Sequence, residues 1–168
     1  GNTALFLSGM IDATNNLATK LELGDQENLK FTNSFTIEGW IKPLVQTNEY
    51  ILGQLAASEE AVTEQIFFRG DSRRCLDPYY MALEQSAPGG FALLFHIESA
   101  NSRDCGMTIE AEGTLVVDRW QHVAAVFERN FQWSTNAPWT TNQLRLYVDG
   151  VRQTNLVLHP DPEPFTDG

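Results

Sequence analysis

Apolar and polar residues alternate along most of this chain, in short runs separated by turn residues. In FTIEGWIKP (35–43), Phe35, Ile37 and Ile41 fall on one side of an extended strand, which is the two-residue period of a half-buried strand. The same pattern predicts further strands at residues 3–8, 18–23, 49–54, 65–69, 79–85, 91–99, 107–111, 114–117, 120–129, 144–149 and 154–159. Helix is scarce, with a turn or two expected at 58–65. Many short strands of this kind indicate an antiparallel β-sandwich or jelly roll.

Turn residues and one wholly apolar run give this outline more detail. Asp149-Gly150 is the signature of a two-residue hairpin, and residues 86–90 form a Gly/Pro turn between two alternating runs. If this second hairpin pairs in register, Tyr79 faces Ile97. Residues 122–127 are apolar on both faces, so we expect a central strand that is covered on both sides. We also expect Trp40 to lie in the core or on a covered concave face.

The length and charge of the chain narrow the classes of function. With 168 residues we expect one domain over residues 1–168. Eleven Lys and Arg residues against 22 Asp and Glu residues give a net charge of −11, which argues against binding to a nucleic-acid backbone. No apolar run approaches the roughly 18 residues that a membrane span requires, so membrane insertion is not expected. An acidic excess suits solubility and divalent cations without proving either.

Two cysteines flank the hairpin around residues 86–90. Extending its pairing puts Cys75 opposite Asn101, four residues before Cys105. A small bulge at the base of the hairpin would bring the two sulfur atoms together. We therefore expect a disulfide, with two separate buried thiols as the alternative, and a disulfide favours an extracellular protein.

Three segments carry a family resemblance: FTIEGWIKP (35–43), DRWQHVAAVFER (118–129) and LRLYVDGVRQ (144–153). In this order and spacing they resemble the laminin G-like domains of the concanavalin A-like lectin/glucanase superfamily. The resemblance implies an all-β fold, an antiparallel two-sheet jelly-roll sandwich. It also implies that these proteins serve as extracellular or cell-surface modules.

The chain departs from the family at its end. Family members usually close with a strand of the pattern Gly-x-Ile-Asp, and nothing like it follows PFTDG (164–168). We therefore expect a jelly roll that lacks its last strand or strands, with an edge of unpaired backbone groups. Either the chain is a piece of a larger multidomain protein, or another chain supplies the strand.

A second departure is the segment FQWSTNAPWTTNQ (131–143), which stands where the family has a tight turn. Long loops of this kind are uncommon unless they are functional. Its aromatic and amide side chains suit stacking on a glycan or contact with an extracellular protein partner, and the candidate ligand-binding residues are Phe131, Trp133, Asn136 and Trp139. The alternative is that both indoles fold back and cap the end of the sandwich.

The resemblance also implies a calcium ion at the rim. The family's calcium-binding Asp maps onto Asp77, and Asp161 is the nearest candidate for a second side-chain ligand. Two carboxylates with backbone carbonyls and water would make a Ca²⁺ site of modest affinity. The alternative is an ordinary turn, because Asp77 precedes Pro78 and Asp-Pro commonly starts turns.

Catalysis is not expected from the carboxylates. Retaining glycoside hydrolases of this superfamily need two carboxyl groups about 5–5.5 Å apart on one strand face. Glu38 stands alone on its strand, Glu59, Glu60 and Glu64 fall in an expected loop, and His122 is a structural residue of the family motif. We expect a non-catalytic recognition or adhesion module. The alternatives are a structural or assembly domain that completes its sheet with another chain, and an unusual glycoside hydrolase.

Overall fold

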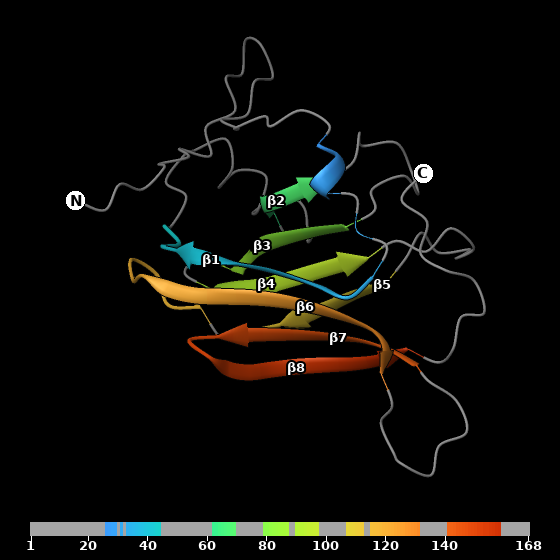
Figure 1. The fold of residues 1–168 in the computed structure, drawn as a ribbon. Coiled ribbons are helices and arrows are strands. Elements are labelled where there is room, and N and C mark those ends of the chain that lie inside the picture. The colour runs from blue at the N-terminus through green and yellow to red at the C-terminus, as the bar shows by residue number, and fades with distance from the viewer. Residues whose placement is uncertain are drawn as a thin grey trace.

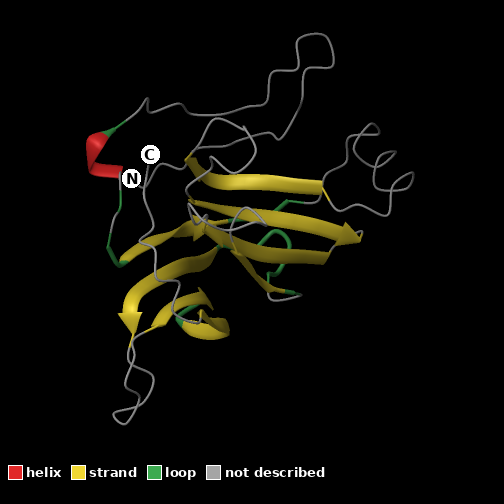
Figure 2. Cartoon of the chain, turned by 90° about the vertical axis from the view of Figure 1, so that its right-hand side faces the viewer, coloured by secondary structure: helices red, strands yellow, loops and turns green. Residues whose placement is uncertain are grey.

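Two antiparallel four-stranded sheets make up nearly all of the described chain (Figures 1 and 2). The computed structural model describes residues 26–29, 31, 33–44, 62–69, 79–87, 90–97, 107–112, 115–131 and 141–158. After the 3-10 helix η1 (Glu27–Leu29) come the strands β1 (Phe35–Ile41), β2 (Val62–Arg69), β3 (Tyr79–Ala87), β4 (Gly90–Ile97), β5 (Met107–Ala111), β6 (Gln121–Phe131), β7 (Thr141–Val148) and β8 (Val151–Leu158).

The strand order is β1-β6-β7-β8 in the first sheet and β2-β3-β4-β5 in the second. Every pair is antiparallel, so the predicted all-β sandwich is confirmed. Within the described residues, no helix has the length and hydropathy needed to cross a membrane.

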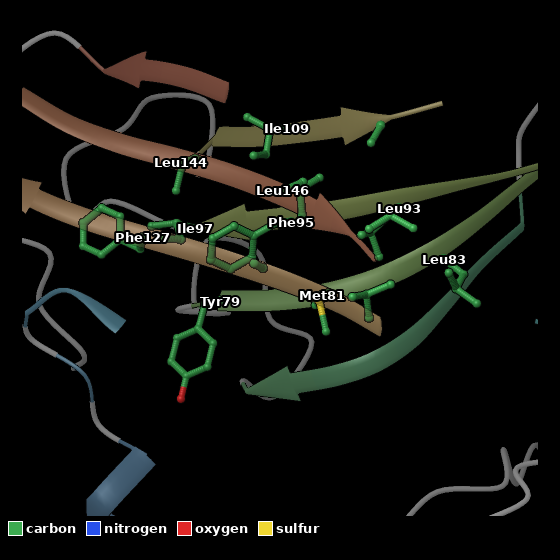
Figure 3. Close-up of a cluster of buried hydrophobic side chains, with 14 of the residues drawn as sticks. Tyr79, Met81, Leu83, Leu93, Phe95, Ile97, Ile109, Phe127, Leu144 and Leu146 are labelled. Carbon is green, nitrogen blue, oxygen red and sulfur yellow. The ribbon is translucent and has the colours of Figure 1, made fainter. Parts of the chain in front are cut away.

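The core lies between the two sheets. Figure 3 shows side chains of β3 and β4 facing those of β6 and β7. The largest fully buried side chains of the core are those of Tyr79, Met81, Leu93, Phe95, Val123, Phe127, Leu144 and Leu146. Burial of each large apolar side chain contributes roughly 1.5–3 kcal/mol, and this makes the inward alternation of the sequence the main determinant of the fold.

The two hairpins expected from the turn residues are both present. In the β3–β4 hairpin Tyr79 pairs with Ile97, as the sequence predicts, and the register shifts only near the turn. In the β7–β8 hairpin Val148 pairs with Val151. The φ angles of Asp149 (50°) and Gly150 (77°) are both positive, as a type I′ turn requires.

The strand built from residues 122–127 is central, since β6 lies between β1 and β7. Its odd-numbered residues Val123, Ala125 and Phe127 belong to the core. On the opposite face Ala124 is buried, whereas His122 and Val126 are partly exposed. The expectation of cover on both sides therefore holds only in part.

Two expectations about local structure were wrong. A strand was expected at 114–117, but its described residues 115–117 form none: the Val116 N–H donates to the Gln121 side chain at 2.6 Å rather than to a neighbouring strand, and the next residue, Asp118, has a φ of 60°. A helical turn was expected at 58–65, but residues 62–65 belong to β2, which pairs with β3. Glu64 thus lies in a strand, because backbone pairing with a neighbouring strand outweighs a weak helix propensity.

Candidate functional site

The predicted ligand-binding insertion begins at the end of β6. Phe131 is the last residue of that strand and pairs with Thr141, the first residue of β7. The insertion therefore links the two strands of one hairpin at the end of the first sheet. Trp133, Asn136 and Trp139 lie outside the described residues, so the glycan-binding role of this segment stays a prediction.

The other predicted sites also lie outside the described residues. These are the calcium ligands Asp77 and Asp161 and the cysteines Cys75 and Cys105. Among the described residues, no group of three or more His, Cys, Asp or Glu side chains is placed to hold a metal ion.

Trp40 is the main surprise of the described structure. Its side chain is 66% exposed, so the expectation that it lies in the core or on a covered face was wrong. Strand alternation explains the difference: Phe35 is buried and Ile37 and Ile41 pack against the core, so Trp40 shares the opposite, outward face of β1 with Glu38.

Trp40 is held beside His122, its partner in the β1–β6 ladder. The two rings meet edge to face, with centroids 5.4 Å apart and an interplanar angle of 64°. The His122 Nε2 atom lies 3.7 Å from Glu38 Oε2. An exposed indole therefore stands next to an imidazole and a carboxylate, a combination that offers an apolar ring face together with hydrogen-bonding groups.

Backbone and side-chain bonds fix the corner of the sheet where Trp40 lies. The His122 N–H donates to Asp149 Oδ1 at 3.0 Å, and the Asp149 N–H donates to the His122 carbonyl at 2.7 Å. Arg119 Nη2 lies 3.5 Å from Asp149 Oδ2. On the other side, the Asp118 N–H donates to the Pro43 carbonyl at 2.8 Å. These bonds tie the end of β1, the start of β6 and the β7–β8 turn to one another.

The three segments that carry the family resemblance meet at this corner. One contributes Trp40, the second His122 and the third Asp149. His122 and Asp149 have a structural role here, since the His122 backbone bonds to both the backbone and the side chain of Asp149. Trp40 is different, because most of its surface contacts solvent and adds little to the stability of the fold.

Large exposed apolar side chains also occur in the segments that meet at this corner. Among the described residues the large exposed hydrophobic side chains are those of Trp40, Leu44, Val116, Trp120 and Val151. All five belong to the segments that these bonds join: the end of β1 and the residues after it, residues 115–120, and the first residue of β8. They do not all share one face, because Val151 pairs with the core residue Val148 and so lies on the side of the sheet opposite to Trp40. Sequence reasoning did not find that these segments meet, because the pairing of β1 with β6 and of β7 with β8 brings them together.

The outward face of the second sheet differs in character. Tyr80 and His96 stack with centroids 4.7 Å apart, and His96 Nδ1 lies 2.8 Å from Thr108 Oγ1. Partial burial raises the pKa of Glu110 above its ordinary value, and the like charges of Glu84 and Glu112 raise it further. This face therefore combines a stacked aromatic pair with carboxylates that repel one another.

Comparison with known proteins agrees with the fold and its motifs. The family model of the concanavalin A-like lectin/glucanases superfamily matches residues 14–168. Comparison with curated proteins and with solved structures gives no match. The match covers both sheets, including the three segments that meet at the Trp40 corner. The chain therefore belongs to the laminin G-like group of the concanavalin A-like lectin/glucanase superfamily.

Proposed function

We propose that this chain is a non-catalytic recognition module of an extracellular or cell-surface protein, and that it binds a glycan on the outward face of β1 and β6. The observation that carries this proposal is the exposed Trp40 ring beside His122 and Glu38. Sugars present C–H faces that stack on aromatic rings, and their hydroxyl groups need donors and acceptors at the edge of the ring.

The neighbours of Trp40 supply those polar groups. Glu38 accepts hydrogen bonds, and its side chain is more than half exposed. His122 can donate or accept through a ring nitrogen, and its contact with the edge of the indole restricts how the indole can turn. A ring that is already oriented loses less conformational entropy when a ligand binds.

The spacing of the described carboxylates on the outward face of β1 and β6 supports a non-catalytic module. Glu38 pairs with Ala124 across the ladder, and Glu128 is the next carboxylate along β6 on that face. Four residues separate Ala124 from Glu128, about 13 Å of strand. Glycoside hydrolases place their two carboxyl groups at about 5–9.5 Å.

The insertion at 131–143 would be a second, separate surface. His122 and Phe131 lie nine residues apart in β6, which is about 30 Å along the strand. A small ligand on Trp40 would therefore not reach the end of β6, where the insertion begins. Within the proposal, the insertion binds another part of a long glycan or a protein partner, with Ca²⁺ at Asp77 and Asp161 as an assisting ion.

Glycan-array binding tests the proposal, with calcium and with chelator. Wild type, Trp40→Ala, a Trp133→Ala/Trp139→Ala double variant and Val151→Ala are compared. Val151 is the control, because it is an exposed apolar residue of the same sheet that lies on the face opposite to Trp40. We expect Trp40→Ala to abolish binding and Val151→Ala to leave it unchanged.

Each alternative result has a distinct meaning. Binding lost only in the double variant would move the site to the insertion, and loss in chelator would implicate Asp77 and Asp161. If folded wild-type protein binds no glycan, the glycan proposal is wrong.

A second candidate function is docking of another protein chain, in line with a structural or assembly domain. The exposed large apolar side chains in the segments that meet at this corner favour it, because exposed apolar surface often marks protein interfaces. Light scattering after size exclusion checks this: a discrete oligomer that a charged substitution at Val151 disrupts supports docking, and a monomer at all concentrations argues against self-assembly.

A further inference from the structure

A shallow hollow lies on the same outward face as Trp40, towards the other end of β1. Its volume is about 280 Å³, and it is lined by Ser34, Phe35, Thr36, Val126, Phe127, Glu128 and Arg145. Thr36, Val126 and Arg145 are successive partners across β1, β6 and β7, so they form one row of the sheet. Their neighbours along each strand belong to the core, which places this row on the outward side.

Arg145 brings an unused donor to this hollow. Its Nη2 atom forms an ion pair with Glu128 Oε2, whereas its Nε atom is buried without a hydrogen-bond partner. A buried donor without an acceptor is uncommon and costs free energy, because the group has lost its water. An acceptor oxygen from a ligand in the hollow would satisfy the Nε–H once the guanidinium turns towards the hollow.

The charges around the hollow define the kind of ligand. Arg145 and Glu128 neutralise each other at 2.5 Å, so the hollow presents no unbalanced charge. An anion would face the Glu128 carboxylate and a chain of net charge −11. A cation would face the Arg145 guanidinium. A neutral hydroxyl group fits both, since it accepts from the Nε–H and donates to the carboxylate.

The hollow and Trp40 lie on a common track. Thr36 and Trp40 are four residues apart on one face of β1, about 13 Å along the strand. Between their two rows, Ala124 lies between Glu38 and Tyr147 in the ladder. The Ala124 side chain is small and buried, so Glu38 and Tyr147 are the polar side chains that flank the path between the two ends.

We propose that the Arg145 hollow is a second subsite for an uncharged, linear oligosaccharide whose other end stacks on Trp40. This inference rests on the proposed glycan-binding function and adds the class of ligand, its charge and its direction along β1. A monosaccharide would occupy one end alone, and a longer chain would occupy both.

Calorimetric titration with neutral oligosaccharides tests this. The probes are the cello-, laminari-, xylo-, manno- and chito-oligosaccharide series from disaccharide to hexasaccharide. For wild type we expect the Kd of one series to fall at least about tenfold as the chain lengthens to reach both ends. Trp40→Ala should abolish binding at every length.

Two variants probe the hollow in different ways. Thr36→Trp fills it from an exposed position, and Arg145→Lys keeps the charge that pairs with Glu128 but lacks the Nε–H. In both variants the Kd should no longer fall as the oligosaccharide lengthens, and the Kd for the disaccharide should be unchanged. Thr108→Trp is the matched control, because it adds the same side chain at an exposed strand threonine of the second sheet. Urea unfolding checks that Arg145→Lys folds, and Thr36→Trp keeps the test decisive if it does not.

The outcomes separate this inference from the function on which it rests. Two results would overturn the subsite and leave the glycan-binding function in place. One is binding that needs Trp40 but has the same Kd at every chain length. The other is an affinity that still rises with chain length in both Thr36→Trp and Arg145→Lys. Equal affinity for sulfated or uronic-acid oligosaccharides would show that the ligand is not restricted to uncharged oligosaccharides. No binding of any probe by wild type would overturn both.

Discussion

Asp149 offers a sharp test of how the Trp40 corner is held. Its φ angle is 50°, and its Oδ1 atom accepts the His122 N–H at 3.0 Å. These are two separate contributions to stability, one from backbone conformation and one from a side-chain hydrogen bond. Substitution by Asn, Gly and Ala removes them in different combinations.

The structure gives a magnitude for each contribution. The hydrogen bond to the carboxylate is exposed, so we take the low end of its range, about 1.5 kcal/mol. The Arg119 ion pair is largely exposed and contributes roughly 0.5 kcal/mol. A positive φ costs an alanine about 1–2 kcal/mol. Glycine avoids that cost but loses roughly 0.4–1 kcal/mol through the greater freedom of the unfolded chain.

These terms predict an order. Asp149→Asn keeps an acceptor oxygen and tolerates the positive φ, so it should cost about 1 kcal/mol. Asp149→Gly should cost about 2.5 kcal/mol and Asp149→Ala about 3.5 kcal/mol. Urea unfolding at one pH and ionic strength measures the free energies, with an unchanged m-value as the sign that the two-state comparison is valid.

Two results would refute this reasoning. If Asp149→Ala costs less than about 1 kcal/mol, the turn does not need Asp149 to hold β6. If Asp149→Ala is more stable than Asp149→Gly, the positive φ carries no penalty. Repeating the series at high salt isolates the ion pair, because screening weakens the Arg119 contribution and leaves the other two.

Three further predictions follow from burial, open space and charge. Gly39→Ala should stabilise the protein by about 0.4–1 kcal/mol in urea unfolding, because an added Cβ meets no atom within 4 Å. Gly150→Ala should destabilise it by roughly 1–2 kcal/mol, because Gly150 has a φ of 77°. If both variants change the free energy of unfolding in the same direction, this argument is wrong. Phe95→Ala should cost about 3–5 kcal/mol and Trp40→Ala less than about 0.5 kcal/mol, so comparable losses would show that Trp40 is structural. The pKa of Glu110 is raised in the folded state, so the stability that its protonated carboxyl group contributes is lost as the pH rises from the ordinary pKa of 4.5 through the raised pKa. The Glu110→Gln variant should therefore be more stable than wild type at pH 7. Thermal unfolding should show that this difference in stability disappears below about pH 4.5.

The sequence alone was sufficient for the fold class and for several local details. Alternation of apolar residues predicted most of the described strands, since a strand that buries one face must place its apolar residues at every second position. The Asp149-Gly150 turn and the pairing of Tyr79 with Ile97 were predicted because short turns set the register of their hairpins. These features depend on residues that are close in the chain.

Contacts between distant segments decided the rest. Val116 lies outside any strand because its N–H donates to the Gln121 side chain. The apolar residues around Val116 do not predict this hydrogen bond. Trp40 was expected in the core or on a covered concave face. Alternation places it on the outward side of β1, and whether another layer covers that side depends on the whole fold.

The candidate site belongs to this second class. Trp40 and His122 are 82 positions apart in the chain, and their rings lie 5.4 Å apart because β1 pairs with β6. The unused Nε donor of Arg145 likewise depends on packing across three strands. Residue types and their local period determined which elements this chain forms, and the pairing of distant strands determined which side chains meet on its surface, because that pairing is set by the burial of the whole core.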